Sequence, residues 1–209
     1  MTLESIHEPA AAAILIVGAG PTGLTLACDV ARRCVPFRIV EAAAAPFLGS
    51  RGKGIQPRTL EVLEDLGVID PILASGSQYP AFRFHWWRRF TLGRWNMHAH
   101  AQPSADVPYP NTWMVPQWRT EAILRERLTQ LGHQVEFGNR LTALEQGPDA
   151  VTAEIAGSGS TERVRCSYLV GADGGRSTVR GLLGIAFTGT TTEAERMVIC
   201  DVEVEGLDR

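Results

Sequence analysis

The sequence predicts an α/β fold built on a parallel β-sheet. Two short aliphatic runs flank a segment of helical periodicity near the N-terminus, and a third run at 168–170 precedes another glycine-rich turn. An aliphatic run that ends in glycine is typical of a strand buried on both faces. Parallel strands need a crossover helix between them, and about thirty residues is the expected size of such a unit.

The first strand–helix–strand unit ends at Glu41. Its predicted elements are a strand at Ile14–Val17, a helix at Pro21–Arg33 and a strand at Phe37–Val40. Pro21 suits the first position of a helix, where the missing N–H costs nothing. The amide groups of the first helical turn should therefore lie directly beside the glycine-rich turn that precedes them.

Two further helices are marked by their end signals. We expect helices at Pro57–Leu66, closed by Gly67, and at Thr120–Leu131, with Thr120 as N-cap and Gly132 as stop. The remaining expectations are a loop over 42–56, short antiparallel strands and loops over 79–116, strands over 135–155 joined by turns at 138–139 and 147–148, a hairpin tip at 157–161, a buried strand at 168–170, a short helix at 178–183 and a strand at 197–204.

The composition is that of an ordinary globular protein, with 209 residues, 44% hydrophobic and 21% charged. The net charge of −3 argues against a nucleic-acid-binding surface. The apolar run at 10–19 is too short to cross a bilayer and lacks the basic flank of a signal peptide. For these two reasons we expect a soluble, cytoplasmic protein that contacts no membrane. No CxxC pair is present, so we expect no zinc site and no thioredoxin-type redox motif. The cysteines, expected to be buried thiols, are Cys28, Cys34, Cys166 and Cys200.

Gly18, Gly20 and Gly23 form a G-x-G-x-x-G turn between the first strand and helix. Gly18 permits the tight turn, Gly20 lets a pyrophosphate approach the backbone, and Gly23 lets the helix pack closely on the strand. Glu41, at the end of the second strand, is placed to accept hydrogen bonds from a ribose. A carboxylate here would repel a 2′-phosphate, so the pattern predicts bound FAD or NAD(H) rather than NADP(H). The alternative is a glycine-rich turn without a ligand.

The second glycine-rich turn, GADGGRS at 171–177, is not needed by a simple NAD-dependent dehydrogenase. The pair of turns resembles the p-hydroxybenzoate hydroxylase-like flavoprotein monooxygenases, which are FAD-dependent aromatic hydroxylases. This resemblance implies a Rossmann-like FAD-binding fold of the glutathione-reductase type, followed by the start of an antiparallel substrate-domain sheet. The similar segments are, in order, GAGPTGL, EAAAAP, SRGKGIQPRTLEVLEDLGV, VPQWRTEAILRERL and YLVGADGGRSTVR.

The resemblance also implies individual roles. Arg51 would lie near the flavin or its diphosphate, and Gln117 would touch the flavin or its ribityl chain. Asp173 would hydrogen-bond the cofactor and help the transient NAD(P)H, and Arg180 would support that turn. Each residue also has a simpler interpretation. Arg51 could be a solvated loop cation and Gln117 an ordinary loop residue. Asp173 could be a turn aspartate, and Arg180 could form an ion pair. The predicted cofactor-binding residues are Gly18, Gly20, Pro21, Thr22, Gly23, Glu41, Arg51, Gln117 and Asp173.

The chemistry of the family supplies the functional expectation. NAD(P)H reduces FAD, oxygen adds at flavin C4a, and the hydroperoxide transfers one oxygen atom to an activated aromatic ring. The implied cofactors and partners are therefore FAD, NADH or NADPH as a transient co-substrate, O2 and an aromatic small molecule. No catalytic base is assigned, because the strands that would face the substrate lie mostly beyond Arg209. The alternatives are a flavoprotein of this fold with other redox chemistry, and a non-catalytic nucleotide-binding module.

The resemblance divides the chain into an FAD-binding domain, residues 1–78 and 112–185, and partial substrate-domain strands, residues 79–111 and 186–209. The third motif of the family, a Gly-Asp pair, has no counterpart, since none of the 21 glycines is followed by aspartate. We therefore expect either a fragment of a longer protein or a truncated homologue. An open sheet edge and exposed apolar surface would then favour a homo-oligomer.

Two other groups of residues were candidates for a site. His98 and His100 share one face of a predicted strand, but a catalytic metal site needs a third ligand from His85 or His133, so no metal site is predicted. Tryptophans could line a pocket for an aromatic substrate, although packing in a core or an interface is the preferred interpretation. They are Trp86, Trp87, Trp95 and Trp113.

Overall fold

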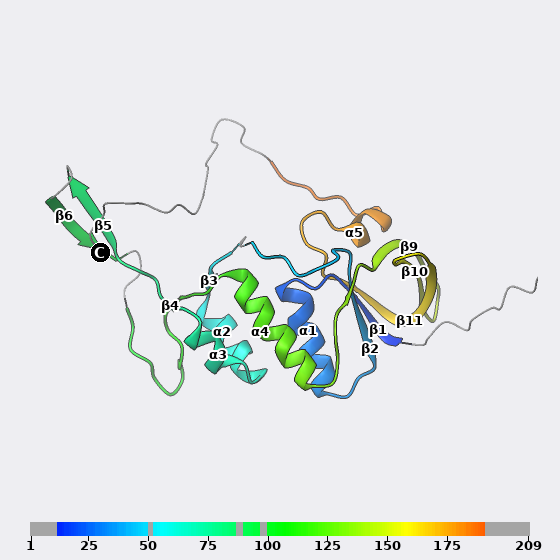
Figure 1. The fold of residues 1–209 in the computed structure, drawn as a ribbon, viewed down its shortest axis with the longest axis horizontal. Helices are drawn as coiled ribbons and strands as arrows, with labels where there is room; N and C mark the ends of the chain where they lie inside the picture. The colour runs from blue at the N-terminus through cyan, green and yellow to red at the C-terminus, as the bar shows by residue number, and fades with distance from the viewer. Residues whose placement is uncertain (1–11, 50–51, 87–89, 97–99, 191–209) are drawn as a thin grey trace, which may run out of the picture.

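The computed structural model describes residues 12–49, 52–86, 90–96 and 100–190. Its main sheet has the strand order β8-β2-β1-β11-β10-β9 (Figure 1). Pairing is parallel from β8 to β11 and antiparallel from β11 to β9. The predicted α/β class with a parallel sheet is confirmed. The strands are β1 Ala12–Val17, β2 Phe37–Glu41, β8 Glu136–Phe137, β9 Arg140–Gln146, β10 Val151–Ala156 and β11 Thr161–Gly171.

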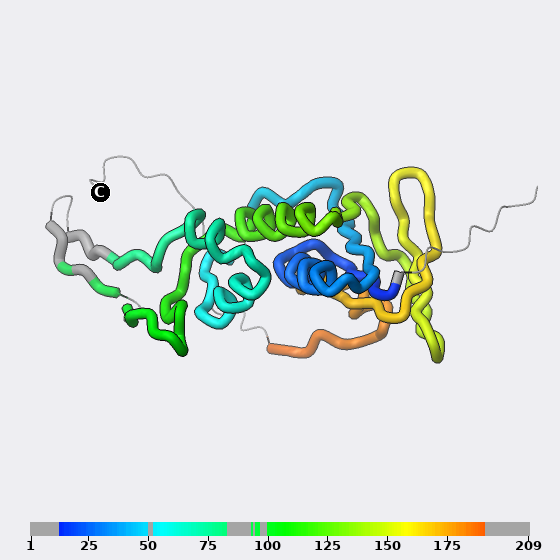
Figure 2. The backbone as a smooth tube through the Cα atoms, turned by 90° about the horizontal axis from the view of Figure 1, so that it is seen from below, coloured from blue at the N-terminus to red at the C-terminus, as the bar shows by residue number. Residues whose placement is uncertain are grey.

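The longer helices α1 and α4 lie side by side on one face of this sheet (Figures 1 and 2). The helices are α1 Pro21–Arg32, α2 Pro57–Asp65, α3 Ile69–Ala74, α4 Gln117–Gln130 and α5 Thr178–Leu182. Pro21 occupies the first turn of α1, and Gly67 and Gly132 follow α2 and α4 with φ of 74° and 85°, as the end signals predicted.

The predicted short antiparallel strands are also present. The strands β3 Gly54–Ile55, β7 Trp113–Met114 and β4 Ser77–Gln78 form a small sheet, and β5 Phe82–Trp86 pairs with β6 Phe90–Trp95. This β5–β6 hairpin projects away from the main sheet (Figure 1). Its assignment to a substrate domain stays a prediction.

Strand β1 separates two hydrophobic cores. Successive side chains of a strand point to opposite faces of the sheet. Ile16 points into the core formed with α1, α2, α3 and α4, whereas Leu15 and Val17 point into a second core formed with β9, β10, β11 and α5. All three side chains are at most 6% exposed. The continuous aliphatic run of the sequence therefore corresponds to a strand covered on both faces.

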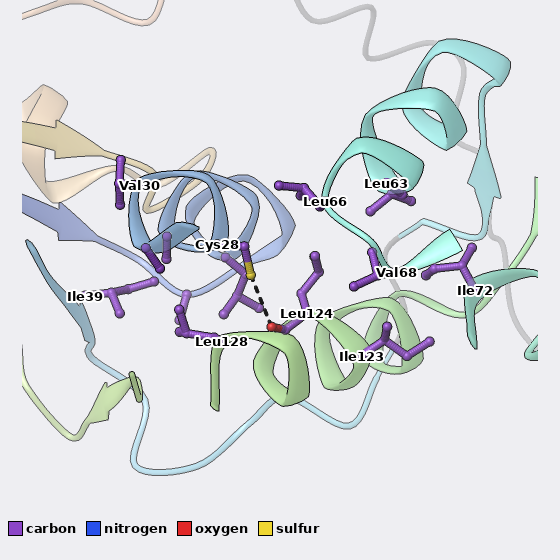
Figure 3. Close-up of a cluster of buried hydrophobic side chains, with 14 of the residues drawn as sticks. Cys28, Val30, Ile39, Leu63, Leu66, Val68, Ile72, Ile123, Leu124 and Leu128 are labelled. Atoms are coloured by element: carbon purple, nitrogen blue, oxygen red, sulfur yellow. Dashed lines mark hydrogen bonds between the residues drawn. The ribbon is translucent and has the colours of Figure 1, made fainter. Parts of the chain in front are cut away.

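Part of the first core lies where α4 meets α1 (Figure 3). Leu124 and Leu128 of α4 point toward α1 and toward Ile39 of β2. The Cys28 thiol of α1 donates a hydrogen bond to the Leu124 carbonyl, with 3.4 Å between sulfur and oxygen. This contact satisfies a weakly polar group that is 0% exposed.

The start of α4 differs from the prediction. The helix begins at Gln117 with Pro116 as N-cap, and Thr120 lies inside its first turn. Pro116 has φ −58° and ψ 139°, an extended conformation that suits a residue flanking the helix start. Gln117 also donates from its side chain to Glu121, one turn further on, which supports this earlier start. Thr120 is therefore not the N-cap of α4, although its hydroxyl suggested this role.

Other parts of the structure also differ from the prediction. The segment 42–56 contains the short strand β3, and α3 was not predicted. The strand at 168–170 is the end of the longer β11, and Tyr168 is 70% exposed rather than buried. Tyr168 pairs with Ile14, but α1 contacts β1 and β2, and the Tyr168 side chain near the end of β11 remains exposed. Cys34 is exposed because it lies in the turn after α1, with φ 56°.

Some predictions fall on residues outside the described ranges. These include the strand at 197–204, Cys200, Arg51 and His98. Across the residues that the structure describes, no helix is long and apolar enough to span a membrane.

The buried thiol of Cys28 predicts a dependence of stability on alkaline pH. Burial raises its pKa to about 11, whereas an unperturbed thiol has a pKa of about 8.5. Between these values the unfolded chain loses the thiol proton and the folded chain keeps it. The free energy of unfolding should therefore fall by up to about 1.4 kcal/mol per pH unit in this window because of Cys28.

The measurement is urea unfolding between pH 8 and 10.5 of the wild-type chain and the Cys28→Ala variant. The difference between them should shrink as pH rises, because the variant lacks this ionisation. Cys34→Ala removes an exposed thiol and is the matched control. Parallel pH profiles for wild type and Cys28→Ala would contradict the prediction.

Candidate functional site

The two glycine-rich turns are in direct backbone contact. Gly18 has φ +103°, and a Cβ at this position would lie 2.5 Å from the Ala172 carbonyl oxygen and 2.8 Å from the Asp173 Cα. The Ala172 N–H donates to the Val17 carbonyl at 2.7 Å. The turns follow β1 and β11, which are adjacent parallel strands, so their carboxyl ends meet at one edge of the sheet. Ligands of open α/β sheets bind at such an edge.

The three glycines of the first turn have different surroundings. A Cβ on Gly23 would lie 1.9 Å from the Gly18 carbonyl oxygen, so Gly23 allows α1 to leave the turn at close range. A Cβ on Gly20 would meet nothing within 4 Å. Gly20 is also the N-cap of α1, and no side chain caps this helix end. The first amide groups of α1 therefore border open space, which is the arrangement that binds phosphate.

A cavity of about 730 Å³ opens between the two turns. This volume lies in the usual range for a small-molecule site. Its walls are residues 18–22 of the first turn, Glu41, the loop residues 43 and 45–47, three side chains of α4, Phe137 of β8, and residues 172–176 of the second turn.

Glu41 is held at the end of β2 by backbone donors. Its Oε2 accepts from the Ala19 N–H and its Oε1 from the Ala43 N–H, both at 2.9 Å. The carboxylate thereby fixes the first turn relative to the loop after β2. A carboxylate has about four lone-pair positions, so each oxygen can accept a further hydrogen bond from a hydroxyl in the cavity.

One face of α4 supplies Gln117, Glu121 and Arg125 to the cavity wall. The Gln117 Nε2 donates to the Glu121 Oε1 at 2.8 Å. The Glu121 Oε2 lies 3.7 Å from the Arg125 Nη1. Glu121 is 4% exposed, and burial lowers the pKa of Arg125 while Glu121 opposes that shift. This wall therefore contains a buried carboxylate held between an amide and a guanidinium.

Asp173 orders its own turn. Its Oδ1 accepts from the Ser177 Oγ at 2.6 Å, and its Oδ2 accepts from the Thr178 and Val179 N–H groups at 2.5 and 3.2 Å. The plainer interpretation of Asp173 as a turn aspartate thus describes real contacts, and the residue also lines the cavity. Arg180 donates from Nη2 to the Gly175 carbonyl at 2.9 Å, in agreement with the support of this turn that the resemblance implies.

Most residues predicted to bind the cofactor lie together around this cavity. Gly23 stands behind the first turn, and Arg51 falls outside the described residues. Glu121 and Arg125 were missed, although their spacings of four and eight residues from Gln117 would have placed them on its face of a helix that began at Gln117. Within the described ranges, no group of three or more His, Cys, Asp or Glu side chains could hold a metal ion. The predicted residues in the cavity wall are Gly18, Gly20, Pro21, Thr22, Glu41, Gln117 and Asp173.

A family model described as FAD binding domain matches residues 11–208. The chain belongs to this family. The resemblance to the p-hydroxybenzoate hydroxylase-like flavoprotein monooxygenases is thereby confirmed.

Proteins similar to this chain include a flavin-dependent monooxygenase of Mycobacteroides abscessus, 46% identical over 93% of this chain and 42% of the relative. A 3-(3-hydroxy-phenyl)propionate/3-hydroxycinnamic acid hydroxylase of Mycolicibacterium smegmatis is 32% identical over 93% of this chain and 34% of its own length. The solved structure of the flavin-dependent monooxygenase PieE in complex with FAD and substrate matches 88% of this chain and 34% of that one, with TM-score 0.75 and 29% identity. The chain thus spans between a third and about two fifths of these proteins.

The geometry of the cavity fits the diphosphate and ribose of FAD. The open space at Gly20 admits a diphosphate to the start of α1. Glu41 faces the same cavity with its carboxylate already fixed. Both features are what a dinucleotide requires at the end of a first strand–helix–strand unit.

The two glycines of the first turn should respond differently to alanine. Gly18→Ala forces a side chain into a positive-φ position and against the Ala172 carbonyl, so we expect a loss of about 2 kcal/mol or more in the free energy of unfolding. The Cβ of Gly20→Ala meets open space, and replacement of the glycine N-cap should cost about 1 kcal/mol or less. Denaturant unfolding of both variants measures this difference.

Gly20→Ala should nevertheless weaken the binding of FAD, because the added Cβ enters the space through which the diphosphate approaches. The prediction fails if Gly18→Ala is as stable as wild type, or if Gly20→Ala is the less stable variant.

Proposed function

We propose that the chain is the FAD-binding part of an NAD(P)H-dependent flavoprotein monooxygenase that hydroxylates a phenolic or other aromatic substrate with O2. The observation that carries the proposal is the shared cavity between the two joined turns, with the open end of α1 on one side and Glu41 on the other. Membership of the FAD-binding family and the similarity to monooxygenases support it.

Different residues of the cavity would contact different parts of the cofactor. The N–H groups at the start of α1 would bind the diphosphate, and Glu41 would accept hydrogen bonds from the adenosine ribose. Gln117 would contact the flavin or its ribityl chain, and Asp173 would hold the second turn against the cofactor. When bound and reduced by NAD(P)H, FAD supplies the activation of O2 and the transfer of one oxygen atom. The residues named here bind and orient the cofactor.

The proposed substrate class is supported by one of the relatives. The relative from Mycolicibacterium smegmatis acts on 3-(3-hydroxy-phenyl)propionate, which carries a phenol ring. We assign no base to the reaction, since the contacts proposed here bind and orient the cofactor.

An absorption spectrum of the purified 209-residue chain, before and after addition of FAD and desalting, tests whether the chain holds the cofactor. We expect retained flavin bands, because the diphosphate and ribose sites lie within the chain. NADH or NADPH oxidation with and without added phenols then tests the chemistry. A protein that shows no flavin bands after addition of FAD and desalting would overturn the proposal for this chain. Retained flavin without any phenol response would overturn the substrate class.

Glu41→Gln tests the ribose contact. Loss of one hydrogen bond to a charged acceptor costs roughly 1.5–3 kcal/mol, so the Kd for FAD should rise by about tenfold or more. Flavin fluorescence titration measures the affinity. Glu145→Gln, on the exposed part of β9, removes the same charge away from the cavity and should bind FAD as the wild type does. Equal FAD affinities for wild type and Glu41→Gln would contradict the proposed contact between Glu41 and the ribose.

A further inference from the structure

The cavity wall formed by α4 carries a cation that the proposed cofactor contacts leave unused. Gln117, Glu121 and Arg125 are spaced by four residues, and all three line the cavity. Two cationic side chains reach this cavity among the described residues, Arg125 and Arg176. Arg176 is exposed on the second turn, whereas only 21% of the Arg125 side chain is exposed. Arg125 is therefore the cation that the fold itself has placed in the wall.

Glu121 determines how the other two side chains lie. A buried carboxylate must be compensated by donors, because its charge has lost most of its water. Its compensation comes from the Gln117 amide at 2.8 Å and the Arg125 guanidinium at 3.7 Å. A carboxylate held in this way repels a diphosphate and does not bind it. Its effect on a ligand is to hold the amide and the guanidinium at the cavity wall.

The guanidinium of Arg125 has donors to spare. It carries five N–H groups in a rigid fork, and the 3.7 Å distance to Glu121 is an ion pair longer than a hydrogen bond. Burial disfavours the charged form, which lowers the pKa of Arg125. A group of this kind gains most from a ligand that brings negative charge and acceptor oxygens. Such forks match phosphate oxygens well.

The position of Arg125 along α4 indicates which half of a bound dinucleotide it would contact. Eight residues of helix separate it from Gln117, which is about 12 Å along the axis. Leu128, one turn further on, packs with Ile39 of β2, and β2 ends at Glu41. Phe137 of β8 pairs with Glu41 and lines the same cavity. Arg125 therefore lies toward the end of the cavity that contains Glu41.

We propose that Arg125, held in place by Glu121, is a further dinucleotide-binding residue that donates to oxygens of the ADP half of the cofactor. This inference rests on the proposed function, since it takes the cavity to be the FAD site. Arg125 is a binding residue in this scheme, and Glu121 is a positioning residue that acts through it.

The test measures the Kd values of ADP and FAD for the 209-residue chain by isothermal titration calorimetry. Arg125→Gln should weaken both ligands by about tenfold, because both carry the group that Arg125 contacts. Glu121→Gln should weaken both by a smaller factor, since it releases the guanidinium without removing it. Arg119→Gln is the matched control: it removes the same charge from the same helix, but Arg119 contacts Ser75 and does not line the cavity.

Removal of Arg125 alone leaves Glu121 buried without its cation. The double variant Glu121→Gln with Arg125→Gln removes this problem, and urea unfolding verifies that each variant folds. Loss of ADP affinity in the folded double variant, with Arg119→Gln unchanged, supports the inference. ADP affinity equal to wild type in either folded variant overturns it while the proposed function stands. A wild-type chain that binds neither FAD nor ADP overturns the proposed function and this inference with it.

Discussion

The backbone contact between Gly18 and the Ala172–Asp173 segment fixes the geometry of the whole site. It joins two turns that are far apart in the sequence, and it is possible because Gly18 has no side chain and a positive φ. The register of β1 with β11 brings both turns to the same edge of the sheet. The two turns that form opposite sides of the cavity are thereby held together.

The same contact explains why β1 must be covered on both faces. Its carboxyl end carries the first turn, so any tilt of the strand would displace Gly18 from Ala172. Leu15 and Val17 hold the strand against the meander of β9, β10 and β11, and Ile16 holds it against the helices. Burial of an aliphatic side chain contributes roughly 1.5–3 kcal/mol. The two cores thus give the junction a rigid base.

The sequence was sufficient wherever a residue acts through its own backbone or its neighbours. Pro21, Gly67 and Gly132 end or begin helices for local reasons, and the glycine spacing of the first turn predicted the turn that now lines the cavity. It was insufficient where the cause lies elsewhere in the fold. The exposure of Tyr168 depends on how other elements pack against β11, and the start of α4 depends on Pro116 and on the pair Gln117–Glu121. Because that start was placed three residues late, the α4 face of the site was missed.

The three carboxylates that line the cavity all accept hydrogen bonds from donors of the protein itself. A diphosphate brings negative charge into a space that Glu41, Glu121 and Asp173 already line. Each of the three is bound by donors of the protein: Glu41 and Asp173 accept from backbone N–H groups, and Glu121 accepts from a side-chain amide beside a guanidinium. Hydrogen bonds of this kind stabilise a carboxylate and spread its charge. Among the described residues, the start of α1 and the largely buried fork of Arg125 are positive groups built into the cavity wall, and a diphosphate is a ligand that both can bind.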